Sequence, residues 1–339
     1  MTRRILAAVI VLIAAVILLI AAWPQLFGLE RQFVVAQIVS LRGLAASVAG
    51  IGVVLFLVIA LTSRRMRRFA GALAILLLVF AGISVAVLAV RGTTPAAFPT
   101  KAAADLTVLS WNTEGSRPGA DEIARLAVAQ HADIVALPET SVATATQVGT
   151  LMTKAGVPMQ VLNLSFDQVD TAHSTSLLIS TKLGEYRRDD SHGTTSTLPS
   201  VIAVPVSGTG PTIVAAHPVA PVLDEMSNWR DGLSWLAKRC DANTIIAGDF
   251  NSTLDHWAGL GTSTPTGLGD LGACHDGARG MKSAGVPSWP TWLPEQLGTP
   301  IDHVIAGSDW TFVGFRVIGT EDGAGSDHRP ILARLRPAS

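Results

Sequence analysis

The sequence predicts an α/β domain with strands of mixed direction, preceded by three transmembrane helices. Three observations lead to this prediction. The first hundred residues contain three long apolar runs. The rest of the chain alternates short, nearly all-apolar runs with amphipathic stretches, which is typical of strands covered on both faces and of the helices that cover them. A glycine-containing turn between two of the apolar runs indicates an antiparallel pair within the sheet.

The three apolar runs of the N-terminal part are each close to the roughly 20 residues that cross a bilayer. They lie at 5–22, 44–61 and 69–90. We therefore expect a membrane region over 1–91. It is followed over 92–104 by a linker rich in Pro, Ala and Thr, with few side chains that could pack. The first run also has features of a cleavable signal peptide, but the other two runs would still hold the chain in the membrane.

Clusters of arginine orient these spans. Arg3 and Arg4 precede the first run, and four arginines at 64–68 separate the second from the third. Short loops rich in Lys and Arg stay in the cytoplasm, so we expect the N-terminus and the second loop inside. The predicted location is the cell membrane, with several passes and an extracytoplasmic domain. Arg42, beside the second run, is expected to snorkel to the membrane surface.

Charge differs between the two parts of the chain. Residues 1–100 carry nine Lys or Arg and one acid, whereas the rest carries 16 basic and 25 acidic residues and all eight histidines. This composition excludes a disordered chain, a collagen-like repeat and a disulfide-rich miniprotein. A net charge of about −9 outside the membrane region also disfavours a polyanionic partner such as DNA. Cys240 and Cys274 form either a disulfide or two buried thiols, and the sequence leaves both open.

The second part of the chain contains nine predicted strands and three predicted helices. The helices are expected at 120–130, 144–155 and 224–239. The strands are expected at 106–111, 133–137, 176–180, 200–206, 212–216, 244–247, 301–306, 311–317 and 330–335. The segment 201–216 is predicted to form a hairpin that turns at 207–210.

Polar side chains recur just past the apolar strands. They are Asn112, Glu139, His217, Asp249 and Asn251, with Asp327 and His328 directly before the last strand. Strand ends are where a sheet delivers side chains to a shared cleft. Carboxylates and amides, without a Cys/His cluster, favour a hard cation such as Mg²⁺ or Mn²⁺, which polarises phosphoryl oxygens. The sequence has no Walker loop, kinase motif or Gly-x-Ser-x-Gly elbow to support nucleotide-driven transfer or serine hydrolysis.

Six motifs, in this order, make residues 105–337 resemble the endonuclease/exonuclease/phosphatase superfamily, here in a membrane-anchored bacterial form. They are Ser110-Trp111-Asn112, Leu137-Pro138-Glu139, Ala216-His217-Pro218, Gly248-Asp249-Phe250-Asn251-Ser252, Ile301-Asp302-His303 and Gly325-Ser326-Asp327-His328-Arg329-Pro330. The superfamily includes DNase I, apurinic endonucleases, neutral sphingomyelinases and inositol polyphosphate 5-phosphatases. The resemblance implies a four-layer sandwich of two packed mixed β-sheets with helices outside. The Glu-Thr-Lys motif typical of apurinic endonucleases is incomplete at Glu139, which argues against DNA repair.

The resemblance also implies catalytic roles for five residues. Asp249 corresponds to the aspartate that activates the attacking water, and Asn251 to the amide that binds the phosphate. His328 corresponds to the histidine that donates to a phosphoryl oxygen, and Asp302 to the carboxylate that pairs with it. His217 would contact the phosphate or protonate the leaving oxygen.

Metal binding and structural roles are implied for other residues. The residues implied for a Mg²⁺ or Mn²⁺ site are Glu139, Asn112 and Asp327. His303 lies on the other face of its strand and is expected to be structural. Trp289 and Trp292 are expected to pack in the core, the alternative being an aromatic rim beside the substrate.

Several functions fit these observations. The leading hypothesis is a membrane-anchored, extracytoplasmic, Mg²⁺-dependent phosphodiesterase acting on lipid head groups or envelope phosphodiesters. Its partners would be the lipid bilayer and a phosphate ester of a lipid, an envelope component or a nucleotide. The alternatives among enzymes are a nuclease outside the cytoplasm, with nucleic acid less favoured, and a phosphomonoesterase of the inositol 5-phosphatase kind. The alternative of another class is a catalytically dead binding protein, against which the complete set of polar residues argues.

Overall fold

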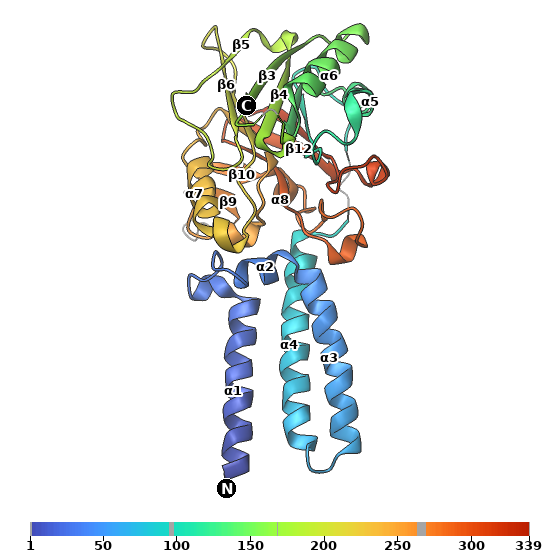
Figure 1. Cartoon of the computed structure of the whole chain (residues 1–339), viewed down its shortest axis with the longest axis vertical. Coiled ribbons are helices and arrows are strands. Elements are labelled where there is room, and N and C mark those ends of the chain that lie inside the picture. Colours follow the sequence, from blue (N-terminus) through green and yellow to red (C-terminus); the bar gives the residue numbers. More distant parts are fainter. Residues whose placement is uncertain (1, 95–97, 168, 263–268, 339) are drawn as a thin grey trace.

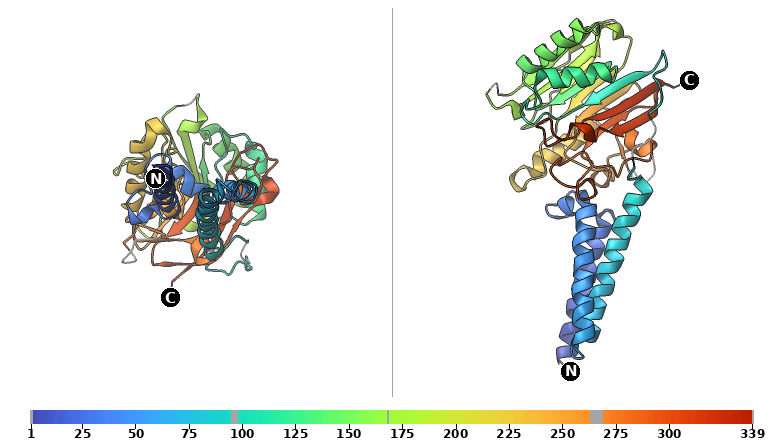
Figure 2. Two further views of the ribbon diagram at one scale, coloured as in Figure 1. Left: turned by 90° about the horizontal axis from the view of Figure 1, so that it is seen from below. Right: turned by 90° about the vertical axis from the view of Figure 1, so that its right-hand side faces the viewer.

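Three long helices carry an α/β domain at one end (Figures 1 and 2). The computed structural model describes residues 2–94, 98–167, 169–262 and 269–338. The long helices are α1 (Thr2–Ala22), α3 (Arg42–Thr62) and α4 (Arg67–Arg91). All three are long and apolar enough to cross a membrane, and each contains one of the predicted runs. The short α2 (Val35–Ser40) lies between them and the α/β domain (Figure 1).

The arginine-rich ends of the three helices lie together. The N-terminus of α1 and the turn that joins α3 to α4 are both at the end of the helices far from the α/β domain (Figure 1). Arg3 and Arg4 are therefore at the same end as the arginines of 64–68. This is the arrangement that the charge pattern predicts.

Two packed mixed β-sheets form the α/β domain, as predicted. The first has six strands among the described residues, in the order β12 (Trp310–Val317), β13 (Ile331–Pro337), β1 (Leu106–Ser110), β2 (Ile134–Pro138), β4 (Ser174–Ser180), β3 (Met159–Ser165). The second has seven, in the order β5 (Tyr186–Arg188), β6 (Val201–Pro205), β7 (Thr212–Ala216), β8 (Thr244–Asp249), β11 (Asp302–Ala306), β10 (Cys274–Asp276), β9 (Asp270–Leu271). The pairs β1/β2 and β7/β8 are parallel, and the other described pairs are antiparallel.

Both faces of the central strands are buried, which explains their nearly all-apolar sequences. Val108 points into the core between the sheets with Ile246, whereas its neighbour Leu109 packs with Val135 on the outer face. The helices are α5 (Gly119–Ala129), α6 (Val142–Lys154), α7 (Met226–Ala237) and the short α8 (Gly277–Gly280). Helices α5 and α6 cover the outer face of the first sheet, and α7 packs on the second.

The structure contains every predicted strand and four that the sequence did not predict. These four are β3, β5, β9 and β10, which are edge strands or very short. The three predicted helical stretches correspond to α5, α6 and α7. Cys240 and Cys274 are bonded, with their Cα atoms 5.7 Å apart, which selects the disulfide over two free thiols.

Gly92 and Phe98 of the segment 92–104 contact the α/β domain, so the expectation of a linker with little to pack was wrong for these residues. The ring centre of Phe98 lies 4.4 Å from the guanidinium carbon of Arg334 and 4.7 Å from that of Arg316. The carbonyl of Gly92 accepts a hydrogen bond from the backbone of Gly285 at 2.9 Å. Residues 95–97 of this segment lie outside the described residues.

A buried ion cluster joins the α/β domain to the long helices. Asp255, in the 3₁₀ helix η5 (Leu254–Trp257), is 4% exposed. Arg42 donates to its two carboxylate oxygens at 2.9 and 2.7 Å, and Arg91 donates at 2.8 Å. Arg42 was expected to snorkel, but it is buried because it finds this carboxylate and the carbonyl of Ala22. Burial raises the pKa of Asp255, but Arg91 and Arg42 bring it in net well below its usual range.

Replacing Asp255 with alanine is expected to destabilise the full chain by about 3–5 kcal/mol, because two largely buried guanidinium groups would lose their anion. The free energy of unfolding of the full chain in detergent micelles measures this. Asp190→Ala is the matched control, since Asp190 pairs with Arg188 on the exposed surface. The Asp190→Ala substitution is expected to lower the free energy of unfolding by less than about 1 kcal/mol. Equal losses in the two variants would show that the ion cluster does not stabilise the junction.

Candidate active site

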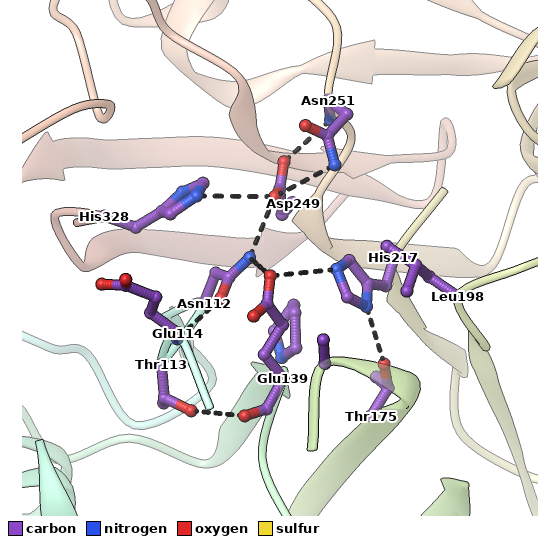
Figure 3. A network of polar contacts seen from close by, with 12 residues as sticks. Asn112, Thr113, Glu114, Glu139, Thr175, Leu198, His217, Asp249, Asn251 and His328 are labelled. Carbon is purple, nitrogen blue, oxygen red and sulfur yellow. Dashed lines mark hydrogen bonds and ion pairs between the residues drawn. The ribbon is translucent and has the colours of Figure 1, made fainter. Parts of the chain in front are cut away.

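The polar residues predicted from the strand ends converge in one place (Figure 3). Asn112 lies just past β1 and Glu139 just past β2, while His217 follows β7 and Asp249 ends β8. Because β1/β2 and β7/β8 are parallel pairs, each pair delivers both of its side chains at the same edge of its sheet. The packing of the two sheets then brings the two pairs of residues together.

Asn112 links the two acidic residues at the centre of the site. Its Nδ2 donates to Glu139 Oε1 and to Asp249 Oδ2, both at 3.0 Å (Figure 3). Its Oδ1 accepts from the backbone N–H of Glu114 at 3.0 Å, which fixes the orientation of the amide. Asn112 is 1% exposed. The carboxylates of Glu139 and Asp249 therefore lie on either side of one buried amide.

The backbone is strained where it presents two of these side chains. Glu139 has a φ of 55° and Asn251 a φ of 46°, in the left-handed region that costs non-glycine residues about 1–3 kcal/mol. Gly248 shows how closely the strands approach, because a Cβ there would lie 2.0 Å from the carbonyl oxygen of Ala216. Such strain persists only where the surrounding structure imposes it, and it is typical of functional sites.

His217 faces Glu139 from the second sheet. Its Nε2 lies 3.7 Å from Glu139 Oε1, and its Nδ1 lies 3.3 Å from Thr175 Oγ1 (Figure 3). The ring is fully buried, and Nε2 has no hydrogen-bond partner among the described residues. Burial raises the pKa of Glu139, but His217 and the amide of Asn112 hold it in net below its ordinary value. Glu139 is therefore a carboxylate at neutral pH.

Asp249 is held by the loop that follows it. The backbone N–H of Asn251 donates to Asp249 Oδ1 at 2.8 Å, and the side-chain amide of Asn251 donates to Oδ2 at 3.3 Å. The same amide donates to the carbonyl of Pro218 at 3.0 Å, which ties the loop after β8 to the loop after β7. Burial raises the pKa of Asp249 to about 6, with the charge of His328 opposing this effect.

His328 pairs with Asp302 beside Asp249. Its Nδ1 lies 2.9 Å from Asp302 Oδ2, and its Nε2 lies 3.7 Å from Asp249 Oδ2 and 3.8 Å from Asp327 Oδ1. Asp302 and Asp249 are direct partners in the register of β11 and β8. Burial lowers the pKa of His328, but Asp302 and Asp249 raise it in net to about 10. The imidazole is therefore protonated at neutral pH and offers an N–H from Nε2.

The sequence of this domain matches one family model, described as the Endonuclease/Exonuclease/phosphatase family, over residues 109–328. The chain belongs to this family. Two solved structures show the same fold at low identity. A humanized TDP2 of D. rerio carrying 14 mutations has a TM-score of 0.51 and 18% identity, and the match covers 69% of this chain and 100% of that one. The AP endonuclease LMAP of Leishmania major has a TM-score of 0.52 and 16% identity, covering 75% of this chain and 95% of that one. Among curated proteins none matches significantly.

This endonuclease/exonuclease/phosphatase domain positions Asp327 with Trp289, which the sequence left between the core and an aromatic rim, and with Glu114, which sequence reasoning missed. Trp289 Nε1 donates to Asp327 Oδ2 at 2.8 Å, and Glu114 Oε2 accepts from the backbone N–H of Asp327 at 2.9 Å. Trp289 and Trp292 were expected in the core, but Trp289 supports a site residue and Trp292 is 72% exposed. Glu114 could have been found from its place two residues after Asn112, whereas the contact of Trp289 depends on the fold alone.

His303, expected to be structural, lies away from the acidic cluster. Its Nδ1 contacts Asp276 Oδ2 and its Nε2 contacts the carbonyl of Ser252, both at 2.9 Å. Both ring nitrogens are thus bound within the second sheet and its loop. Its neighbour Asp302 points toward His328 instead, because successive side chains of a strand face opposite ways.

The donor set fits the divalent cation on which members of this family commonly depend. Glu139 and Asp249 offer carboxylate oxygens on either side of Asn112, and the side chain of Glu139 remains 22% exposed. Asp249, Asp302 and His328 also place ligand-type atoms within 4.8 Å of one another. A protonated imidazole does not bind a cation, so the raised pKa of His328 makes Glu139 the better ligand. The oxygen-rich set is the kind that Mg²⁺ or Mn²⁺ prefers.

Asp302→Asn is expected to lower the pKa of His328, because it removes the charge that contributes most to raising it. His328 would then lose its proton at a lower pH, so the alkaline limb of a kcat–pH profile should move toward neutrality. The profile and the imidazole NMR signals both measure this shift. Asp170→Asn, beside the partly exposed His173, is the control and should leave the limb in place. An unmoved limb in Asp302→Asn would show that His328 does not act as a charged donor.

Proposed function

We propose that the chain is a membrane-anchored, extracytoplasmic phosphodiesterase that depends on Mg²⁺ or Mn²⁺ and cleaves lipid head groups or envelope phosphodiesters. Membership of the family supports phosphoester hydrolysis. Three helices long and apolar enough to cross a membrane support the anchoring. The arginine clusters at the end of these helices far from the α/β domain support the extracytoplasmic side.

The observation that carries this proposal is the contact between the loops of the active site and the ends of the long helices. The loop after His217 reaches α2, where Gln37 donates to the carbonyl of Pro221. The loop after Asn251 reaches it too, because His256 Nε2 lies 3.1 Å from the carbonyl of Ala36. Both loops that carry the second sheet's site residues therefore rest on the segment beside the apolar helices.

A third loop also contacts the ends of the long helices. The segment 285–300 carries Trp289, and its Gly285 is hydrogen-bonded to Gly92 just past α4. The same segment packs so closely on α3 that a Cβ on Gly43 would lie 1.9 Å from the carbonyl oxygen of Gln296. If the helices span a bilayer, these loops lie at the depth of the lipid head groups, which contain phosphodiesters.

The side chains of the site have complementary roles in this reaction. Asp249, with its pKa raised to about 6, is ionised at neutral pH and a stronger base than an ordinary carboxylate, so it accepts the proton of the attacking water. His328 donates to a phosphoryl oxygen, while His217 lies across from it for the leaving oxygen. The amide of Asn251 donates to Asp249 and to the carbonyl of Pro218, so Asn251 holds Asp249 in place rather than binding the phosphate. A divalent cation, when bound at Glu139, would neutralise charge on the phosphoryl oxygens.

The charge of the chain supports a lipid over a nucleic acid. Outside residues 1–100 the net charge is about −9. An anionic domain repels a polyanion at long range, and DNA binding gains most of its affinity from cationic contacts to phosphates. A lipid substrate needs no such attraction, because the anchor already holds the domain at the membrane surface.

Hydrolysis by the purified full chain in detergent micelles tests the proposal. The substrates are phosphatidylglycerol, single- and double-stranded DNA, bis-p-nitrophenyl phosphate and p-nitrophenyl phosphate, each with Mg²⁺ or EDTA. We expect turnover of the lipid and of the model diester that EDTA abolishes. Faster cleavage of DNA than of the lipid would replace the proposal by a nuclease, and preference for the monoester by a phosphatase. Absence of turnover on every substrate would favour the alternative of a catalytically dead binding protein.

A further inference from the structure

A cavity of about 410 Å³ lies between the long helices and the α/β domain, apart from the catalytic side chains. Its lower wall is made of small and apolar residues of α3 and α4, among them Ala46, Ala81 and Val85. Its upper wall comes from the α/β domain and includes Thr253 and Pro287. A volume of this size is typical of sites for small molecules.

The polarity of the cavity changes along its length. Ala81 is ten residues below Arg91 on α4, so the lining extends along about 15 Å of the helix axis. The lower part is lined by apolar helix residues and by Ser47, whose hydroxyl donates to the carbonyl of Gly43 within the helix. The upper part contains Arg42 and Arg91 at the helix ends, together with the hydroxyl of Thr93. This gradient matches an amphipathic molecule that has its apolar part between the helices.

The upper end also has an unused cationic donor. Asp255 neutralises one of the two arginines, and Glu295 adds an acid at the exposed rim. Only Nη1 of Arg91 donates to a described residue, and the side chain is 17% exposed. A guanidinium has five N–H donors, so Arg91 keeps the capacity for a two-pronged contact with a phosphate.

We propose that this cavity binds one membrane phospholipid, with an acyl chain between α3 and α4 and its phosphate at Arg91. The ligand class follows from the apolar lining, which continues the lipid-facing surface of two helices long enough to span a bilayer, and from the cation at their outer end. The site is separate from the catalytic residues and does not depend on which phosphoester the chain cleaves.

The upper wall connects this lipid site to the active site. Pro287 is followed by Ser288, whose Oγ accepts from the backbone N–H of Asp302 at 3.2 Å. The carbonyl of Ser288 accepts from the backbone N–H of Arg329 at 2.7 Å, next to His328. A lipid in the cavity therefore supports the segment that holds the Asp302–His328 pair, and we expect it to raise turnover.

Native mass spectrometry of the full chain in detergent micelles containing phosphatidylglycerol tests the lipid site. Ala89→Trp and Val85→Trp place a bulky ring in the cavity. Ala86→Trp is the matched control, since Ala86 is an exposed alanine on the same helix that does not line the cavity. We expect the native chain and Ala86→Trp to retain one phospholipid. The two cavity variants should need at least about tenfold more lipid for the same occupancy.

Two results would overturn the lipid site: no lipid retained by the native chain, or equal retention by Ala89→Trp, Val85→Trp and Ala86→Trp. Titration with phosphatidylcholine tests whether the phosphate is enough for binding, whatever the rest of the head group. Retention of phosphatidylcholine equal to that of phosphatidylglycerol supports the site as well. The same samples are assayed with water-soluble bis-p-nitrophenyl phosphate, whose turnover should rise with bound lipid in the native chain and in Ala86→Trp but not in the two cavity variants. Lipid retention without any turnover would contradict the proposed function and leave the lipid site standing.

Discussion

Asp249→Asn is expected to lower kcat on bis-p-nitrophenyl phosphate by on the order of 10²–10⁴-fold, the usual contribution of a general base. The amide has the shape of the carboxylate but cannot take a proton from water. The amide oxygen can still accept from the backbone N–H of Asn251, but the amide NH2 cannot accept from Asn112, so the free energy of unfolding is measured beside kcat. The measurement is steady-state kinetics of the full chain with saturating Mg²⁺.

A matched control separates this effect from a general loss of folding. Asp231→Asn makes the same change on the exposed surface of α7 and should retain the native kcat. If Asp249→Asn kept more than about a tenth of the native rate, the loss would be smaller than the removal of a general base causes, and the role of Asp249 would be contradicted. The proton acceptor would then have to be another group.

Glu139→Gln is expected to raise the Mg²⁺ concentration needed for half-maximal activity by at least on the order of 10–100-fold. Loss of a residue that only hydrogen-bonds to a metal ligand already weakens metal affinity by about 10–100-fold, and Glu139 is positioned as a ligand itself. Its low pKa and partial exposure leave it a free carboxylate, while its amide contact with Asn112 can be kept by glutamine. Activity titrated with Mg²⁺ and calorimetry of Mn²⁺ binding both measure the change.

Glu185→Gln is the control for this experiment, because Glu185 is exposed and lies just before the edge strand β5. Its Mg²⁺ requirement should equal that of the native chain. A Glu139→Gln chain with a native Mg²⁺ requirement would place the cation elsewhere, and the group of Asp249, Asp302 and His328 would be the next candidate.

The central strands and the residues at their ends could be predicted from the sequence, because both follow from local pattern. A strand buried on both faces must be apolar throughout, and β1, β2, β7 and β8 are. The polar residues that end such strands stand out against them. The edge strand β3 was missed because it is only half-buried, so Gln160 and Asn163 interrupt its apolar pattern.

The contacts that join distant parts of the chain could not be predicted from local pattern. Arg42 and Asp255 are 213 residues apart, and nothing near either residue indicates the other. The role of Trp289 beside Asp327 likewise depends on the fold, since a tryptophan with a free N–H suits a core or a site equally well. The disulfide also needed coordinates, because two cysteines give no distance.

The central claim is that side chains from both sheets meet around one divalent cation. Anomalous scattering from crystals of the full chain soaked in Mn²⁺ tests it most directly. The account predicts a single strong peak in contact with the carboxylate of Glu139, on the side of Asn112 and Asp249. A peak elsewhere, or no peak in crystals of a chain whose activity requires Mn²⁺, would contradict it.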